Sequence, residues 1–180
     1  MPGSTSVASA ASPRHVPLTT ADFCCRARTV HGARIGVVDE PGVPGGLGRL
    51  TYGELLSRCD GMIAALDRMQ IGSGERVAVI SPNAAKLLIA LFAVTGSGRI
   101  LVPINFRLTP DEAQFIVDDA ETAVLLIDPE LDERFASVRA PRRVVMDGEA
   151  DAELFAPAGA ALEWPAVPEE APATINYTSG

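Results

Sequence analysis

Short, almost entirely apolar runs alternate with stretches of helical periodicity through the middle of this sequence, and this alternation restricts its fold more than any other feature. The runs are residues 76–80, 100–104 and 123–127. Strands without polar alternation are typical of a parallel sheet that is covered on both faces. Parallel strands need crossover connections, which are usually helices. The sequence therefore predicts an α/β fold of three layers around a mainly parallel sheet, with right-handed crossovers.

Two capping boxes mark the starts of helices between these runs. Thr51 and Glu54 form the first box, and Thr109 and Glu112 form the second, with Pro110 at the first helical position. The first box opens an amphipathic helix that we expect to end at Gly72 and Gly74, with a buried stripe of Leu55, Cys59, Met62, Ile63, Leu66 and Met69. The second box is expected to start a helix through Phe115, Ile116 and Ala120.

The remaining elements are assigned from the same kinds of signal. A helix is expected from Thr20 to Gly32, followed by a strand at 35–39 that pairs with 49–51 as a hairpin. Ser81-Pro82 predicts a helix start, a short helix is expected at 131–138, and strands are expected at 144–146 and 173–177. The helix from Thr20 is predicted to bury Phe23, Ala27 and Val30. The helix that starts at Ser81-Pro82 is predicted to bury Leu87, Leu88, Leu91, Phe92 and Thr95.

Composition changes at both ends of this alternating region. Residues 1–18 are rich in serine and contain no acidic residue, which predicts a disordered tail without the apolar core of a secretory signal. Residues 149–172 are rich in Ala, Pro and Glu and show little periodicity, so they are expected to form a surface connection. One domain, residues 19–180, is therefore predicted.

Charge and cysteine content exclude several classes of protein. The formal net charge of −8 argues against binding nucleic acid, and no apolar run approaches the ~20 residues of a membrane span. Cys24, Cys25 and Cys59 show no metal-ligand spacing, which predicts structural thiols in the reducing cytoplasm and no metal site.

Only the end of the sequence offers residues suited to a ligand. The Gly-x-Gly pairs at 72–74 and 96–98 follow helices, where glycine serves as a cap, and no lysine-containing phosphate loop or nucleophile elbow is present. In contrast, the strand predicted at 173–177 leads into Thr178, Ser179 and Gly180. Hydroxyls and backbone amides of a tight loop can bind phosphate oxygens, and glycine permits the turn. No catalytic residue is predicted.

Four stretches, in the same order, resemble a known family. They are Leu-Thr-Tyr-Gly-Glu-Leu at 50–55, the segment 74–83, Val-Pro-Ile-Asn-Phe-Arg-Leu-Thr-Pro-Asp-Glu at 102–112 and Ile-Asn-Tyr-Thr-Ser-Gly at 175–180. Together they resemble the N-terminal portion of the adenylate-forming (AMP-binding) enzymes, in their acyl-CoA synthetase branch. The chain departs from the family at 96–99, where Gly-Ser-Gly-Arg replaces the usual Lys-Ala-Gly. The resemblance implies the first subdomain of a truncated N-terminal adenylation domain.

By this resemblance, the full-length protein is expected to convert a carboxylic acid, in particular a fatty acid, to an acyl-adenylate with ATP and Mg²⁺. It would then transfer the acyl group to coenzyme A. Thr178 and Ser179 would bind phosphate and Gly180 would form the turn, while the 180-residue fragment alone is expected to be inactive. The alternatives are a non-catalytic interaction module that self-associates or binds a companion chain, half of a split enzyme, a peptide-synthetase adenylation domain and a luciferase-like enzyme.

Overall fold

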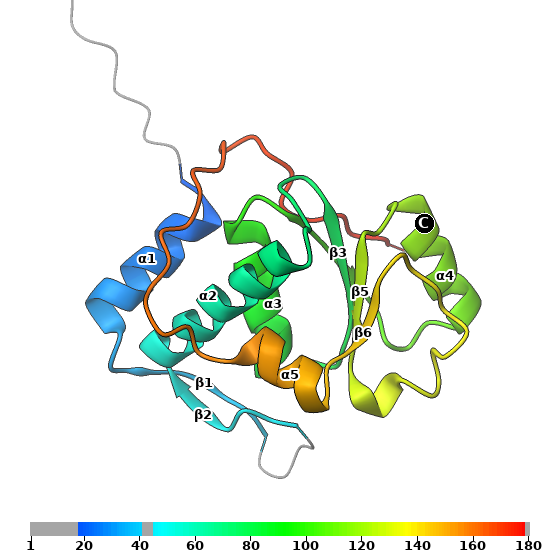
Figure 1. Cartoon of the computed structure of the whole chain (residues 1–180), viewed down its shortest axis with the longest axis horizontal. Helices are drawn as coiled ribbons and strands as arrows, with labels where there is room; N and C mark the ends of the chain where they lie inside the picture. Colours follow the sequence, from blue (N-terminus) through cyan, green and yellow to red (C-terminus); the bar gives the residue numbers. More distant parts are fainter. Residues whose placement is uncertain (1–17, 41–44, 179–180) are drawn as a thin grey trace, which may run out of the picture.

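The computed structural model describes residues 18–40 and 45–178. Apart from Leu18, the tail expected at 1–18 lies outside the described residues. The elements in chain order (Figure 1) are α1 (Thr20–His31), β1 (Ile35–Val38), β2 (Arg49–Thr51), α2 (Tyr52–Arg68), β3 (Arg76–Ile80), α3 (Ala85–Gly96), β4 (Ile100–Ile104), α4 (Pro110–Asp119), β5 (Val124–Ile127), the 3₁₀ helix η1 (Pro129–Leu131), β6 (Arg143–Val145) and α5 (Gly148–Phe155).

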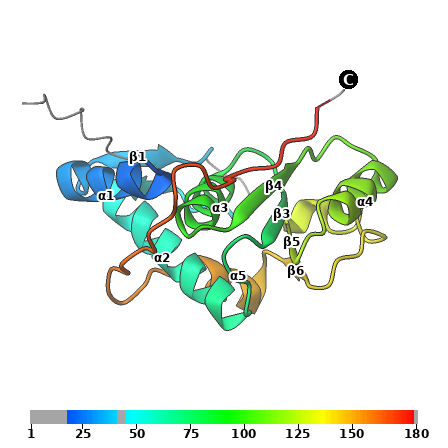
Figure 2. The ribbon, with the colours of Figure 1, turned by 90° about the horizontal axis from the view of Figure 1, so that it is seen from above.

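The central sheet has four strands in the order β4-β3-β5-β6, and every neighbouring pair is parallel. β1 and β2 form a separate antiparallel hairpin, as expected. Side chains alternate across the sheet, so Val77 and Val79 pack with α2, α3 and α5 on one face. Ala78 and Ile80 pack with α4 on the other (Figure 2). The predicted three-layer α/β fold with a parallel sheet is confirmed.

Both predicted capping boxes are formed. The Thr51 hydroxyl accepts from the Glu54 backbone N–H at 3.2 Å, and the Glu54 carboxylate accepts from the Thr51 N–H at 2.8 Å. Thr109 and Glu112 repeat the arrangement at 3.3 and 2.7 Å. Hydrogen bonds from the threonine backbone, and then from its hydroxyl, lower the pKa of each glutamate. These helix starts are specified entirely by neighbouring residues.

The buried faces of α1 and α4 differ from the prediction. Phe23 and Val30 are 62% and 56% exposed, and Cys24 is the residue of α1 that is buried. Phe115 of α4 is 63% exposed, whereas Ile116 is buried. Each helix covers only part of its neighbours, and the contact side is set by the elements beneath it, which periodicity alone does not identify.

The start and the buried face of α3 also differ from the prediction. The helix begins at Ala85 rather than at Ser81-Pro82, because the carboxylate of Asp39 caps it from the hairpin. Asp39 accepts from the backbone N–H groups of Ala85 and Leu47, each at 2.7 Å. The fully buried side of the helix consists mainly of Ile89, Ala90, Ala93 and Val94, while Leu87, Leu88, Leu91 and Phe92 are only partly buried.

Three further segments depart from the prediction. The helix expected at 131–138 is η1 followed by turns, and the first part of the connection expected at 149–172 is the helix α5, which buries Leu154 and Phe155. The strand expected at 173–177 is reduced to one isolated bridge between Thr174 and Leu101.

The glycine cap predicted at the C-terminus of α2 is not formed, whereas the one predicted after α3 is. The helix α2 ends at Arg68, not at the glycines, and Gln70 adopts the left-handed conformation with φ 62°. Gly98 does follow α3 with φ 77°, which confirms its role as a cap.

Candidate functional site

The C-terminal segment, residues 173–178, runs alongside β4 at the edge of the sheet (Figure 2). The Leu101 N–H donates to the Ala173 carbonyl and the Ile175 N–H donates to the Leu101 carbonyl, each at 2.9 Å. The bridge is parallel, so the segment advances in the same direction as β4. Thr178 therefore lies toward the carboxyl ends of the strands.

Side chains of the segment alternate between the two faces of the sheet. Ile175 and Tyr177 pack against the core on the α4 side. The Tyr177 hydroxyl donates to Asp119 at 2.6 Å, and this hydrogen bond is the main cause that raises the pKa of Tyr177 to about 12. Thr174 and Asn176 face the α3 side, where they line a groove. Thr178 is exposed, whereas Ser179 and Gly180, predicted to share its role, lie outside the described residues.

The order of the strand connections predicts a ligand-binding crevice at the carboxyl ends of β3 and β4. β3 continues into α3 on one face, and β4 continues into α4 on the other. In open α/β sheets, ligands bind where consecutive connections diverge to opposite faces. The C-terminal segment lies beside this position.

Two helix N-termini near this crevice are already occupied by carboxylates. A free helix N-terminus attracts anions because its amides are unpaired and its dipole is positive. Asp39 takes that place at α3, and Glu112 takes it at α4 together with Thr109. These two helix N-termini therefore have no free amide cluster to offer an anion.

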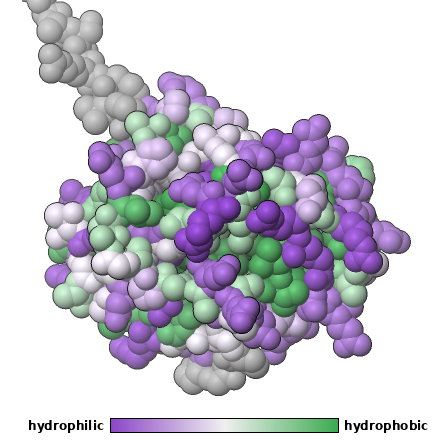
Figure 3. Space-filling view, viewed as in Figure 1, coloured by the Kyte–Doolittle hydropathy of each residue, from purple (hydrophilic) through white to green (hydrophobic). Residues whose placement is uncertain are grey.

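An apolar groove of about 410 Å³ runs along α3 next to the segment. Its walls are Leu87, Leu88, Leu91, Leu101 and Pro103, and its polar margin is Asn83, Thr174 and Asn176. The three leucines of α3 are among those that sequence periodicity assigned to the core. The face that carries α2 and α5 is mostly hydrophilic or mixed, with one compact hydrophobic group to the right of its centre (Figure 3).

A larger hollow of about 760 Å³ lies at the opposite edge, before the starts of β3, β5 and β6. Its lining includes Glu75, Thr122 and Arg142, and the Thr122 hydroxyl is buried there without a hydrogen-bond partner. This hollow lies at the amino ends of the strands, whereas Thr178 lies toward their carboxyl ends.

In residues 18–40 and 45–178, no group of three or more His, Cys, Asp or Glu side chains is placed to hold a metal ion. Nor is any helix there both long enough and apolar enough to cross a bilayer.

Burial is the main cause that raises the pKa of the Cys24 thiol to about 12, and it raises the pKa of Cys59 as well.

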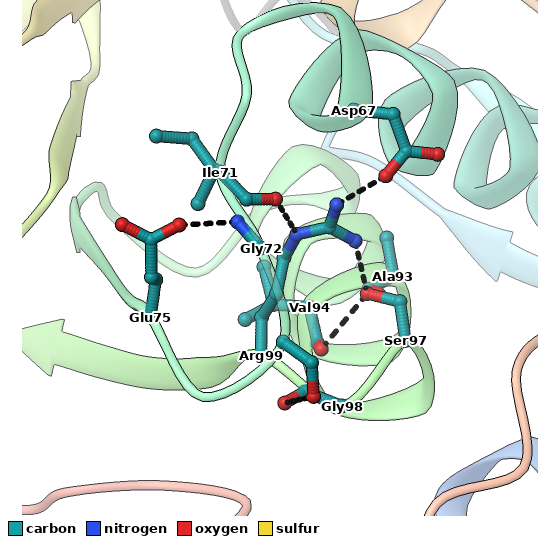
Figure 4. A network of polar contacts seen from close by, with 10 residues as sticks. Asp67, Ile71, Gly72, Glu75, Ala93, Val94, Ser97, Gly98 and Arg99 are labelled. Carbon is teal, nitrogen blue, oxygen red and sulfur yellow. Dashed lines mark hydrogen bonds and ion pairs between the residues drawn. The ribbon is translucent and has the colours of Figure 1, made fainter.

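Besides Asp39, sequence reasoning missed three buried charged residues that fix the scaffold of the site. The first, Arg99, lies at the position where the chain departs from the resembling family. Its Nε donates to the Ile71 carbonyl and its Nη1 to the Ser97 hydroxyl, each at 2.8 Å, and Asp67 pairs with Nη2 (Figure 4). Arg99 thereby joins the ends of α2 and α3 at the start of β4.

The other two are Lys86 and Asp60. Lys86 donates to the Met146 carbonyl at 3.3 Å and pairs with Asp151, so it ties α3 to α5. Asp60 accepts from Arg28 at 2.8 Å and from the Trp164 indole at 2.6 Å. In the sequence, each of these residues is visible only as a charge within an apolar run. That signal does not show which residue the charge will pair with.

Comparison with known proteins identifies relatives for most of the chain. The family model described as AMP-binding enzyme matches residues 26–180. A long-chain-fatty-acid–CoA ligase of Thermus thermophilus is 35% identical over 140 residues, which cover 73% of this chain and 26% of that protein. A feruloyl-CoA synthase of an Amycolatopsis species is 38% identical over 104 residues, covering 57% of this chain and 21% of that protein.

The fold is also found in a solved structure. The crystal structure of an anthranilate CoA ligase with anthranoyl-AMP matches with a TM-score of 0.81 at 22% identity, covering 96% of this chain and 33% of that chain. The chain thus spans between a fifth and a third of the length of these relatives.

Proposed function

Because the chain belongs to the AMP-binding enzyme family, we propose that it is the N-terminal part of an acid–CoA ligase that activates a carboxylic acid with ATP. The acyl-adenylate and pyrophosphate form first, and the acyl group then passes to the thiol of coenzyme A as the acyl–phosphate bond breaks and AMP leaves. A fatty acid is the proposed substrate, in keeping with the Thermus relative. The feruloyl relative indicates that aromatic acids are also used by similar ligases.

The observation that carries this proposal is the course of the C-terminal segment. It leads an exposed Thr178 to the crevice at the carboxyl ends of β3 and β4, where the neighbouring helix N-termini are already capped. We assign Thr178 and Ser179 to the ATP phosphates and Gly180 to the turn of the loop.

The chemistry required of these residues is positioning and charge stabilisation. A carboxylate oxygen of the acid attacks the α-phosphorus of ATP, and the bond to the bridging oxygen breaks as pyrophosphate leaves. Hydroxyls that donate to β- and γ-phosphate oxygens hold the leaving group in line and stabilise its developing charge. Among the described residues, no group of three or more His, Cys, Asp or Glu side chains is placed to hold a metal ion, and no step is assigned to Mg²⁺ on this chain.

The 180-residue chain alone is expected to be inactive. Its one lysine, Lys86, is buried and held by Asp151 and the Met146 carbonyl, so it does not reach a nucleotide at the sheet edge. Carboxylate-dependent exchange of labelled pyrophosphate into ATP should stay at the level of a protein-free control. Exchange clearly above that level, in a preparation free of other ligases, would contradict this expectation.

Comparison of two threonines tests the proposed phosphate site in a protein that carries the complete domain. Thr178→Ala should remove a charge-assisted hydrogen bond of about 1.5–3 kcal/mol. The adenylation rate constant should then fall roughly ten- to hundred-fold, if the bond tightens in the transition state. The melting temperature should hardly change, because the side chain is exposed.

The control is Thr109→Ala, which removes a helix cap. This change should lower the free energy of unfolding by about 1 kcal/mol and leave the activity per folded site nearly unchanged. Full activity in Thr178→Ala, together with loss of activity in Thr109→Ala, would show that the phosphate site lies elsewhere.

A second candidate function is an interaction module or one half of a split enzyme. The partly buried leucines of the groove along α3 favour it, because contiguous apolar surface promotes association. Light scattering should then show self-association, and an apolar dye should bind. A dye-free monomer at high concentration would exclude this candidate.

A further inference from the structure

The C-terminal segment is reached through a long strap, residues 156–173, that contains no helix or strand. It leaves the end of α5, passes along α2 and α1, and crosses to the far side of β4 (Figure 1). Where the C-terminal segment meets the sheet edge therefore depends on how this strap is fastened.

Trp164 is the most firmly held side chain of the strap. Its indole N–H donates to the buried carboxylate of Asp60 at 2.6 Å, and the same carboxylate accepts from Arg28. The ring also covers Gly96 at the end of α3, where an added Cβ would fall within 3.0 Å of the ring. One residue of the strap is thus attached to α1, α2 and α3 together.

Between Trp164 and the sheet edge the strap has little slack. Pro165, Pro168 and Pro172 fix the φ angle at three of the eight positions 165–172, and the Ala171 N–H donates to the Pro168 carbonyl at 3.0 Å. Proline-rich segments behave as semi-rigid spacers. A fixed Trp164 therefore restricts where Ala173 can arrive.

Beyond the spacer, few bonds hold the C-terminal segment itself. The two backbone bonds to Leu101 are its only backbone attachments to the sheet within the described residues. An edge segment with so few inter-strand hydrogen bonds does not fix its own pairing register. The strap that leads into the segment then decides which residue pairs with Leu101.

We propose that Trp164 is a positioning residue, which sets the register of residues 173–178 on β4 and thereby aims Thr178 at the crevice. The anchor is specific, because Trp164 lies between exposed neighbours and bonds to a carboxylate that is itself buried. The role in aiming Thr178 rests on the proposed function, whereas the role in register does not.

The register is tested on the 180-residue chain by amide hydrogen exchange, which reports local opening. Trp164→Phe keeps a ring over Gly96 and removes the donor to Asp60, while Gly96→Ala displaces the ring from the other side. In both variants the Leu101 and Ile175 amides should exchange at least about tenfold faster. The Leu125 amide, which donates to Arg142 within the sheet at 2.8 Å, should keep its rate.

Leu162→Ala is the matched control, because Leu162 lies two residues away in the strap and is exposed. It should leave all three amides unchanged. Unchanged exchange at Ile175 in both test variants would overturn the proposal, and so would an equal acceleration at Leu125, which would indicate a general loss of stability.

A kinetic experiment in the complete protein separates this proposal from the proposed function. Trp164→Phe should raise the KM for ATP by about three- to tenfold and leave the KM for the acid nearly unchanged, because only the phosphate contacts are displaced. If the Ile175 amide exchanges faster but the KM for ATP is unchanged, Trp164 sets the register of the C-terminal segment but does not aim Thr178. Absence of any ligase activity in the unmutated complete protein would refute the proposed function alone.

Discussion

Gly61→Ala is expected to reverse the usual effect of replacing a helical glycine. In an exposed helix interior this change adds about 1 kcal/mol to the free energy of unfolding, because alanine restricts the unfolded chain more than glycine does. Gly61 lies in α2 against the end of α5, and its added Cβ would fall well under 3.0 Å from the carbonyl oxygen of Ala156. That carbonyl belongs to the backbone, so no flexible side chain can move away.

The magnitude follows from what must shift. Overpacking of this kind costs roughly 1–3 kcal/mol. Displacing Ala156 also disturbs two adjacent contacts, from the Ala158 N–H to the Ser57 carbonyl at 2.9 Å and from Arg58 to the Phe155 carbonyl at 2.6 Å. Each is a hydrogen bond worth about 1 kcal/mol. After the gain in helix propensity, a net loss of about 1–3 kcal/mol remains.

Thermal melting and urea unfolding measure this loss directly. At about 2–4 °C per kcal/mol for a chain of this size, the melting temperature should fall by roughly 2–12 °C. Gly159→Ala is the control, because Gly159 lies in the strap shortly after Ala156 and has open space around its Cα. A Gly61→Ala variant as stable as the unmutated chain, or more stable, would refute the packing argument.

Two further changes test the local anchors. Asp39→Ala should lower the free energy of unfolding by about 0.5–2 kcal/mol, because it removes the cap of α3, whereas Glu40→Ala at the exposed neighbouring position should have little effect in urea unfolding. The pKa values of Glu54 and Glu112 are lowered in the folded state, so their stabilisation is complete above the usual glutamate pKa and decreases as the pH falls through the folded values. Glu54→Gln with Glu112→Gln should therefore flatten the acid side of the stability–pH curve, and an unchanged slope would contradict the capping role.

The sequence by itself determined those features that depend on neighbouring residues or on a two-residue period. The capping boxes at Thr51 and Thr109 fixed two helix starts, since donor and acceptor lie three residues apart. The apolar run of β3 implied a buried parallel strand, because a strand covered on both faces has no polar side.

The tertiary structure decided everything that depends on partners distant in the chain. α3 begins at Ala85 because its cap, Asp39, lies 46 positions earlier, and the strap is anchored because Trp164 meets Asp60 from 104 positions away. The outward-facing Phe23 follows from which side of α1 meets its neighbouring helices. Periodicity indicates that a helix has an apolar side, but only the packing of the neighbouring elements determines which side becomes buried and which polar groups meet there.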